Sequence, residues 1–267
     1  MAILLGCGDG LHTFEGALRR VECPLESVSV LSCGGFATVD RQARLLWDGR
    51  RLLDVEPGIE TVLCWRGHTL TLSSETDSIT LRDGQTGQPV TLAPAGVYPQ
   101  HMCFSAQVDT VAACGGADGC IRLLALPSLN VLALWQVPGS ASRIALHRGV
   151  LYALCAVENG DLRCLLCRLP LQGRRCDPLL TLPGLPGAIS GDGRQGLWVA
   201  AGEMLYHVLP GAKGADAVYG GFGLISCLAP TEHGLLVCDP VMDLCCLLRR
   251  GARTVIRSGG VQCAGVW

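Results

Sequence analysis

Short apolar segments alternate with polar turns along the whole chain. In residues 78–94, the apolar segments SITLR and PVTLAP are separated by the turn DGQTGQ. Apolar segments of this length, bounded by Gly, Pro, Asp and Asn, are typical of β-strands. We find no convincing segment with apolar residues at i, i+3, i+4 and i+7, the spacing of an amphipathic helix. The pattern therefore predicts an all-β protein.

The strands and turns repeat in units of 34 to 45 residues. Within 59–96, the four expected strands are TVLCWR, HTLTLSS, SITLRD and PVTLAP. The segments that begin at residues 114 and 156 repeat the same order of an acidic turn, a strand, a second turn and a second strand. Repeats of this length are typical of arrays in which each unit buries its faces against its neighbours. The six complete units are 25–58, 59–96, 97–139, 140–184, 185–223 and 224–260.

The two ends of the chain combine into a seventh unit. Residues 261–267 (VQCAGVW) supply one strand, and residues 1–24 supply three. Four-stranded units that close a ring in this way form a β-propeller. We therefore predict one domain, 1–267, that is a seven-bladed β-propeller with four antiparallel strands per blade, closed by the C-terminal strand. The alternative for this length is a (β/α)8 barrel, which needs eight amphipathic helices.

Composition agrees with stacked blades. The chain is 49% hydrophobic and 16% charged, whereas about 25% of residues are charged in typical domains. Sheets buried on both faces require this excess of apolar residues.

Two segments carry a family resemblance. SITLRDGQTGQPVTLAPAG (78–96) resembles the YVTN-type repeat, and LLWDG (45–49) resembles the strand end of a WD-repeat blade. The resemblance implies a seven-bladed propeller and leaves the function open. The Gly-His and Trp-Asp pairs of WD repeats are missing from nearly every expected blade.

Neither a cofactor nor a metal ion is expected from the motifs. The opening segment GCGDG has Leu11 where a dinucleotide fingerprint needs its third glycine. The dipeptide Asp9-Gly10 instead favours a hairpin turn. The only CxxC pair, Cys164 and Cys167, lies in an expected strand, where the two side chains point to opposite faces.

Charge and cysteine usage suggest a cytoplasmic location. The net charge of −2 argues against nucleic-acid binding, which favours a basic excess. No apolar segment reaches the length of a transmembrane helix, so we expect no membrane contact. The sixteen cysteines lie mostly in apolar segments, as small hydrophobic residues of a reducing compartment do.

Polar residues are expected where the innermost strands begin, at one mouth of the central channel. Glu26, Glu60 and His101 come from three consecutive blades, and two carboxylates with an imidazole can bind a divalent cation or act as an acid/base pair. The alternative is that a wet channel simply tolerates polar residues. No residue is predicted to be catalytic, since no serine nucleophile motif occurs. The candidate binding residues at the mouth are Glu26, Glu60, His101, Arg143 and Gln262.

The turns expected on the same side as this mouth are rich in acids. Asp77, Asp118 and Asp243 are candidate binding residues of this acidic face. Each is a common turn former, but together such acids produce a negative field. We therefore expect a protein partner with a basic patch.

The sequence favours a non-catalytic scaffold for protein–protein interaction. This hypothesis rests on the regular repeat, the acidic face and the lack of a catalytic motif, and partly on analogy. The alternative is a propeller enzyme, such as a metal-dependent lactonase or hydrolase, or a small-ligand binder, acting at the channel mouth.

Overall fold

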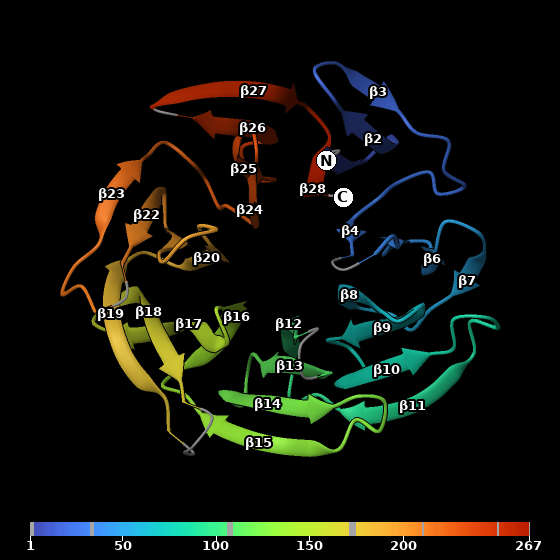
Figure 1. The fold of residues 1–267 in the computed structure, drawn as a ribbon, viewed down its shortest axis with the longest axis horizontal. Coiled ribbons are helices and arrows are strands. Elements are labelled where there is room, and N and C mark those ends of the chain that lie inside the picture. Colours follow the sequence, from blue (N-terminus) through green and yellow to red (C-terminus); the bar gives the residue numbers. More distant parts are fainter. Residues whose placement is uncertain are drawn as a thin grey trace.

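The protein is a ring of seven four-stranded antiparallel sheets around a central axis (Figure 1). The computed structural model describes residues 3–32, 35–105, 109–170, 175–209, 211–249 and 251–266. These residues contain no helix, and therefore none of the length and apolarity needed to cross a membrane. The predicted seven-bladed β-propeller is confirmed.

In each sheet the strands run from the channel outward. The closing sheet contains β28 (Val261–Val266), β1 (Ile3–Cys7), β2 (Gly10–Phe14) and β3 (Leu18–Arg20). The next contains β4 (Val30–Leu31), β5 (Thr38–Asp40), β6 (Leu45–Trp47) and β7 (Leu52–Asp54). The third contains β8 (Ile59–Trp65), β9 (His68–Ser73), β10 (Ser78–Arg82) and β11 (Pro89–Pro94).

The other four sheets have the same order. They contain β12 (Pro99–Ser105), β13 (Thr110–Gly115), β14 (Cys120–Ala125) and β15 (Val131–Gln136). They continue with β16 (Ser140–His147), β17 (Val150–Asn159), β18 (Asp161–Leu169) and β19 (Asp177–Pro183). Next come β20 (Pro186–Gly191), β21 (Leu197–Ala201), β22 (Met204–Val208) and β23 (Asp216–Tyr219). The last are β24 (Cys227–Thr231), β25 (Gly234–Asp239), β26 (Leu244–Arg249) and β27 (Ala252–Ser258).

The ring closes through β28 and β1. Ile3 lies opposite Val266 and Cys7 opposite Val261 in an antiparallel pair. The predicted closure by the C-terminal strand is therefore confirmed. Since Cys7 leads into the β1–β2 turn, this turn lies where the innermost strand β28 begins. We call this side of the ring, where every innermost strand begins, the mouth face.

The core lies between the sheets. Trp135 and Ile121 of one sheet pack with Ile144 and Leu151 of the next in one buried cluster. In contrast, most side chains of the outermost strands are exposed, and Leu92 of β11 is 67% exposed. Middle strands therefore lose polar alternation because both of their faces are covered.

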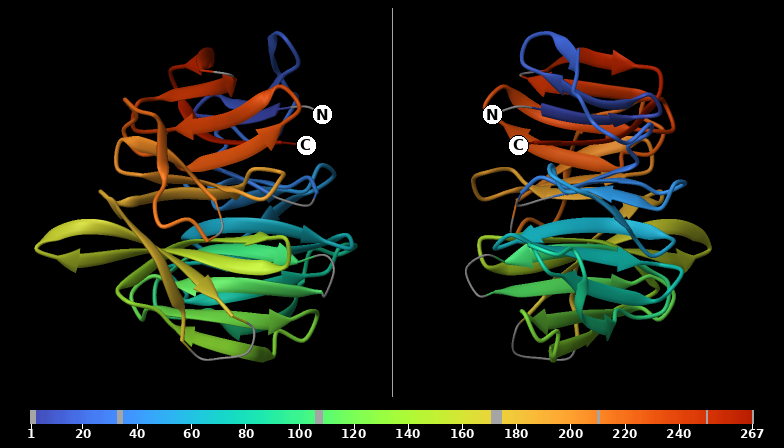
Figure 2. Two further views of the ribbon diagram at one scale, coloured as in Figure 1. Left: turned by 60° about the vertical axis from the view of Figure 1, so that its left-hand side comes forward. Right: turned by 90° about the vertical axis from the view of Figure 1, so that its right-hand side faces the viewer.

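The β17–β18 hairpin extends beyond the neighbouring sheets (Figure 2). Cys164 and Cys167 lie in it and belong to different core clusters, on opposite faces of the sheet.

Candidate functional site

Glu60 is fixed at the channel mouth by two neighbours. It is the second residue of β8, and its Oε2 accepts a hydrogen bond from Nη2 of Arg41 at 3.0 Å. Ser74 Oγ donates to its Oε1 at 2.9 Å. Arg41 follows β5 of the preceding sheet, so the ion pair joins two blades. Both carboxylate oxygens are thus engaged, and Glu60 holds the Arg41 guanidinium in place.

His101 and Arg143 lie on neighbouring innermost strands, β12 and β16, which contact each other. Burial lowers the pKa of His101 to about 3, and the positive charge of Arg143 acts in the same direction. The imidazole is therefore neutral at neutral pH. Arg143 Nη1 donates to the backbone oxygen of Ser142 at 2.8 Å. A neutral imidazole accepts a proton and a guanidinium binds an anion, so the pair combines two complementary functions.

Glu26 and Gln262 are exposed at the mouth face. Glu26 precedes β4, and Gln262 is the second residue of β28. The Gln262 Oε1 accepts from Ser27 Oγ at 3.4 Å.

The donor set does not fit a metal ion at the mouth. In the described part of the chain, Glu26, Glu60 and His101 do not form a group whose ligand atoms lie within 4.8 Å of one another. The oxygens of Glu60 already serve Arg41 and Ser74. The alternative in which two carboxylates and an imidazole bind a cation therefore has no support in the geometry, because the Arg41 guanidinium already binds the Glu60 carboxylate.

Cys7, Asp9 and His12 do bring their ligand atoms within 4.8 Å of one another. However, Arg257 Nη2 lies 3.0 Å from both Asp9 oxygens, and its Nη1 lies 3.0 Å from His12 Nε2. Burial raises the pKa of the Cys7 thiol to about 11, which disfavours the thiolate that binds metals. Arg257 therefore links β27 to the closing sheet through Asp9 and His12, and the cluster is better explained by this contact than by a metal site.

The acidic turns of the mouth face hold backbone amides. Asp77 Oδ1 accepts from the amide of Tyr98 at 2.6 Å, and Asp118 Oδ2 accepts from that of Val97 at 3.2 Å. Asp243 accepts from the amide of Val261 at 2.7 Å. Each carboxylate therefore fixes the loop that enters an innermost strand. A basic protein partner for this face stays a prediction, and replacing these acids would also loosen the loops.

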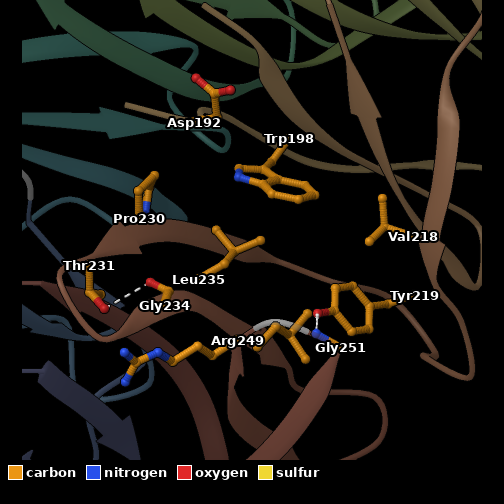
Figure 3. A pocket seen from close by; sticks show the side chains of 11 residues that line it. Asp192, Trp198, Val218, Tyr219, Pro230, Thr231, Gly234, Leu235, Arg249 and Gly251 are labelled. Atoms are coloured by element: carbon orange, nitrogen blue, oxygen red, sulfur yellow. Dashed lines mark hydrogen bonds between the residues drawn. The ribbon is translucent and has the colours of Figure 1, made fainter. Parts of the chain in front are cut away.

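A pocket of about 440 Å³ lies between sheet β20–β23 and sheet β24–β27 (Figure 3). It is lined by residues of both sheets, including Trp198, Tyr219, Leu235 and Arg249. Arg249 ends β26 next to the β26–β27 turn, on the side of the ring opposite the mouth face. The sequence does not reveal this pocket, because its lining residues are spread over sixty positions and only the stacking of two sheets brings them together.

Comparison with known proteins finds no matching family model and no matching curated protein. Solved structures do match over nearly the whole chain. A provisionally named 6-phosphogluconolactonase from Bacteroides uniformis matches with a TM-score of 0.71 and 13% identity, covering 99% of this chain and 98% of that one. A protein from Lactobacillus plantarum matches with a TM-score of 0.76 and 11% identity, covering 99% of both chains. The U3-55K structure matches with a TM-score of 0.66 and 14% identity, covering 89% and 84%.

The name of the Bacteroides uniformis protein is that of an enzyme, and the match spans both chains. This finding contradicts the scaffold prediction, which is withdrawn in favour of the enzyme alternative. At 13% identity the similarity establishes the fold, so the activity is a proposal. The chain is a seven-bladed propeller whose mouth face carries a neutral histidine beside an arginine.

Proposed function

We propose that the protein is a hydrolase that opens the ring ester of a small anionic lactone at the channel mouth. The observation that carries this proposal is His101 beside Arg143 on neighbouring innermost strands. The provisional name of the Bacteroides uniformis neighbour, a 6-phosphogluconolactonase, supports the lactone class. The proposal needs no metal ion.

In the proposed reaction, His101 accepts a proton from a water molecule as the water oxygen attacks the lactone carbonyl. The negative charge that develops on the carbonyl oxygen lies beside the Arg143 guanidinium. The ring C–O bond then breaks, and the imidazolium of His101 returns the proton to the leaving alkoxide. The product is the open hydroxy acid.

The low pKa of His101 explains why the substrate should be anionic. A base with a pKa of about 3 is weak, and part of the depression comes from the charge of Arg143. A bound anion neutralises this charge and so raises the pKa of His101 towards the range in which a general base is effective. A neutral lactone leaves the base weak.

The test measures hydrolysis of a phosphorylated sugar-acid lactone in a pH-stat, with the unphosphorylated lactone as the comparison. We expect a rate above spontaneous hydrolysis for the phosphorylated lactone only. The His101→Gln variant should lose about a hundredfold in kcat, and the Arg143→Gln variant should also lower kcat, because its guanidinium stabilises the charge that develops in the transition state. The control is Arg148→Gln, in the β16–β17 turn on the opposite side. Rates equal to buffer for both lactones, or an unchanged rate in His101→Gln, would overturn the proposal.

We also propose a cytoplasmic location. Its support is that fourteen cysteines of the described residues form no disulfide. Cysteines without disulfides in such number are typical of a reducing compartment.

A further inference from the structure

The pocket between sheets β20–β23 and β24–β27 has the walls of a small-molecule site. Its volume of about 440 Å³ lies within the usual range of roughly 300–1,000 Å³ for ligand pockets. Leu235 and Leu248 are buried in the wall, and Val218 covers one side. Figure 3 shows the Trp198 and Tyr219 rings on the same side of the pocket as Val218. The walls therefore suit a flat apolar body.

The aromatic groups offer donors to this space. The Tyr219 hydroxyl oxygen accepts the amide of Gly251 at 3.0 Å, which leaves its proton free to donate. The Trp198 indole is a donor only, and the centroid of its ring lies 4.6 Å from that of the His207 ring. The hydroxyl of Thr231, in contrast, already donates to the oxygen of Gly234 at 2.8 Å. The free hydrogen-bonding capacity of the pocket is thus on the donor side.

The two charged residues of the pocket differ in how they are engaged. Both oxygens of the Asp192 carboxylate already have partners, because its Oδ2 lies 2.9 Å from His207 Nε2 and its Oδ1 accepts from the amide of Arg194. Arg249 is exposed, and its guanidinium has no carboxylate within ion-pair distance in the described part of the chain. Of the two, Arg249 is therefore the group whose hydrogen-bonding atoms can bind a ligand.

We infer that this pocket binds a small organic anion with an aromatic body, whose acid group lies at Arg249 and whose ring packs between Trp198, Tyr219 and Leu235. The apolar walls remove the ring from water, and Arg249 binds the acid group. The site lies on the side opposite the mouth face. It therefore does not depend on the proposed lactone hydrolysis, and each can fail without the other.

The test uses three naphthalene probes of similar size and different charge: naphthalene-2-carboxylate, 2-naphthylmethanol and 2-naphthylmethylammonium. Binding to the purified full chain is measured by ligand-observed NMR and by calorimetry. We expect the carboxylate to bind at least about tenfold more tightly than the alcohol, because a charge-assisted hydrogen bond adds this order of affinity. The ammonium should bind most weakly of the three.

Two variants assign the site. Arg249→Gln should weaken carboxylate binding roughly tenfold and leave alcohol binding unchanged. The matched control is Arg194→Gln, an exposed arginine near the pocket whose side chain does not line it. Equal binding of all three probes, tighter binding of the ammonium, or equal losses in the two variants would each overturn the inference. Unchanged melting temperatures of both variants exclude unfolding as the cause.

Discussion

The carboxylate of Asp243 accepts a hydrogen bond from the backbone amide of Val261 at 2.7 Å. Its other oxygen accepts from the amide of Gly260 at 2.8 Å. A turn of sheet β24–β27 thus fixes the first residue of the strand that closes the ring. Asp239 at the start of the same turn is fully buried and accepts four backbone amides, from residues 223, 224, 241 and 242.

Replacing Asp243 should therefore weaken the closure. We expect Asp243→Ala to lower the free energy of unfolding by about 1–3 kcal/mol, since two amides lose a charged acceptor. Urea unfolding measures this. The control is Asp161→Ala, because Asp161 is an exposed residue at the tip of the β17–β18 hairpin, and its carboxylate lies 3.6 Å from Arg163 in an exposed ion pair. Equal effects of the two substitutions would show that the Asp243 contacts are not stabilising.

Deletion of residues 261–267 removes β28 and exposes the edge of β1. Open edges pair with other chains, so we expect aggregation and a lower melting temperature. Light scattering and thermal unfolding measure both. A truncated protein that stays monomeric with unchanged melting would contradict the closed ring as the basis of stability.

Local signals made the fold predictable from the sequence. Turn residues and apolar segments recur in every blade, and VQCAGVW at the end completes the pattern that residues 1–24 begin. The positions of Glu60, His101 and Arg143 near the starts of innermost strands follow from the same repeat.

The contacts of these side chains were not predictable. A strand pattern does not reveal that Arg41 of the preceding blade forms an ion pair with Glu60. Nor does it reveal that Arg257 binds Asp9, which is 248 residues away in the sequence. The spacing of the repeat likewise predicts the acidic turns, but not that their carboxylates accept hydrogen bonds from backbone amides of the neighbouring loops. The ion pairs and these hydrogen bonds depend on how the side chains of neighbouring sheets pack. The spacing of the sequence repeat does not determine that packing.

A buried ion pair should make stability depend on pH. Burial raises the pKa of the Glu56 carboxyl, but the hydrogen bond from Thr71 and the charge of Arg82 outweigh it, so the pKa lies below its usual value. The stability that the carboxylate contributes is therefore complete above its unfolded-state pKa and is lost as the pH falls through the folded-state value. We expect Glu56→Gln to destabilise by about 3 kcal/mol at pH 7, because Arg82 stays buried without its counter-charge.

The control for Glu56 is an exposed ion pair, Asp177 with Arg168 at 2.8 Å. We expect Asp177→Asn to change the free energy of unfolding by less than about 1 kcal/mol. Urea unfolding at pH 7 and pH 4 compares the two variants. A smaller loss of unfolding free energy in Glu56→Gln than in Asp177→Asn would contradict the stabilising role of the buried Glu56–Arg82 pair.

His101 should oppose folding in acid. Its folded-state pKa of about 3 lies below the ordinary 6.5, so the unfolded chain binds the proton first as the pH falls. Above pH 6.5 His101 does not reduce the free energy of unfolding. As the pH falls from 6.5 towards 3, this free energy decreases progressively, by about 2 kcal/mol at pH 5. His101→Gln should lose less stability than the parent between pH 7 and pH 5. Parallel pH curves would contradict a neutral, buried imidazole.

The thiols should be reduced and slow to react. Burial raises the pKa of Cys164 and of Cys238 to about 12, so at pH 8 almost no thiolate is present. Iodoacetamide should therefore label these two cysteines slowly in the native protein and quickly in urea, as followed by peptide mass spectrometry. Intact mass without reductant should match the fully reduced chain. Several native disulfides would contradict both the free thiols and the proposed compartment.

The pairing of β28 with β1 has a consequence for synthesis of the chain. About 250 residues separate these strands, which at roughly 5–20 residues per second amounts to some ten to fifty seconds of translation. Throughout that interval the inner edge of β1 has no partner from its own chain. We therefore expect nascent chains to bind ribosome-associated chaperones through residues 3–7 until the last strand emerges. A circular permutant that places 261–266 directly before residue 3 would shorten this exposure.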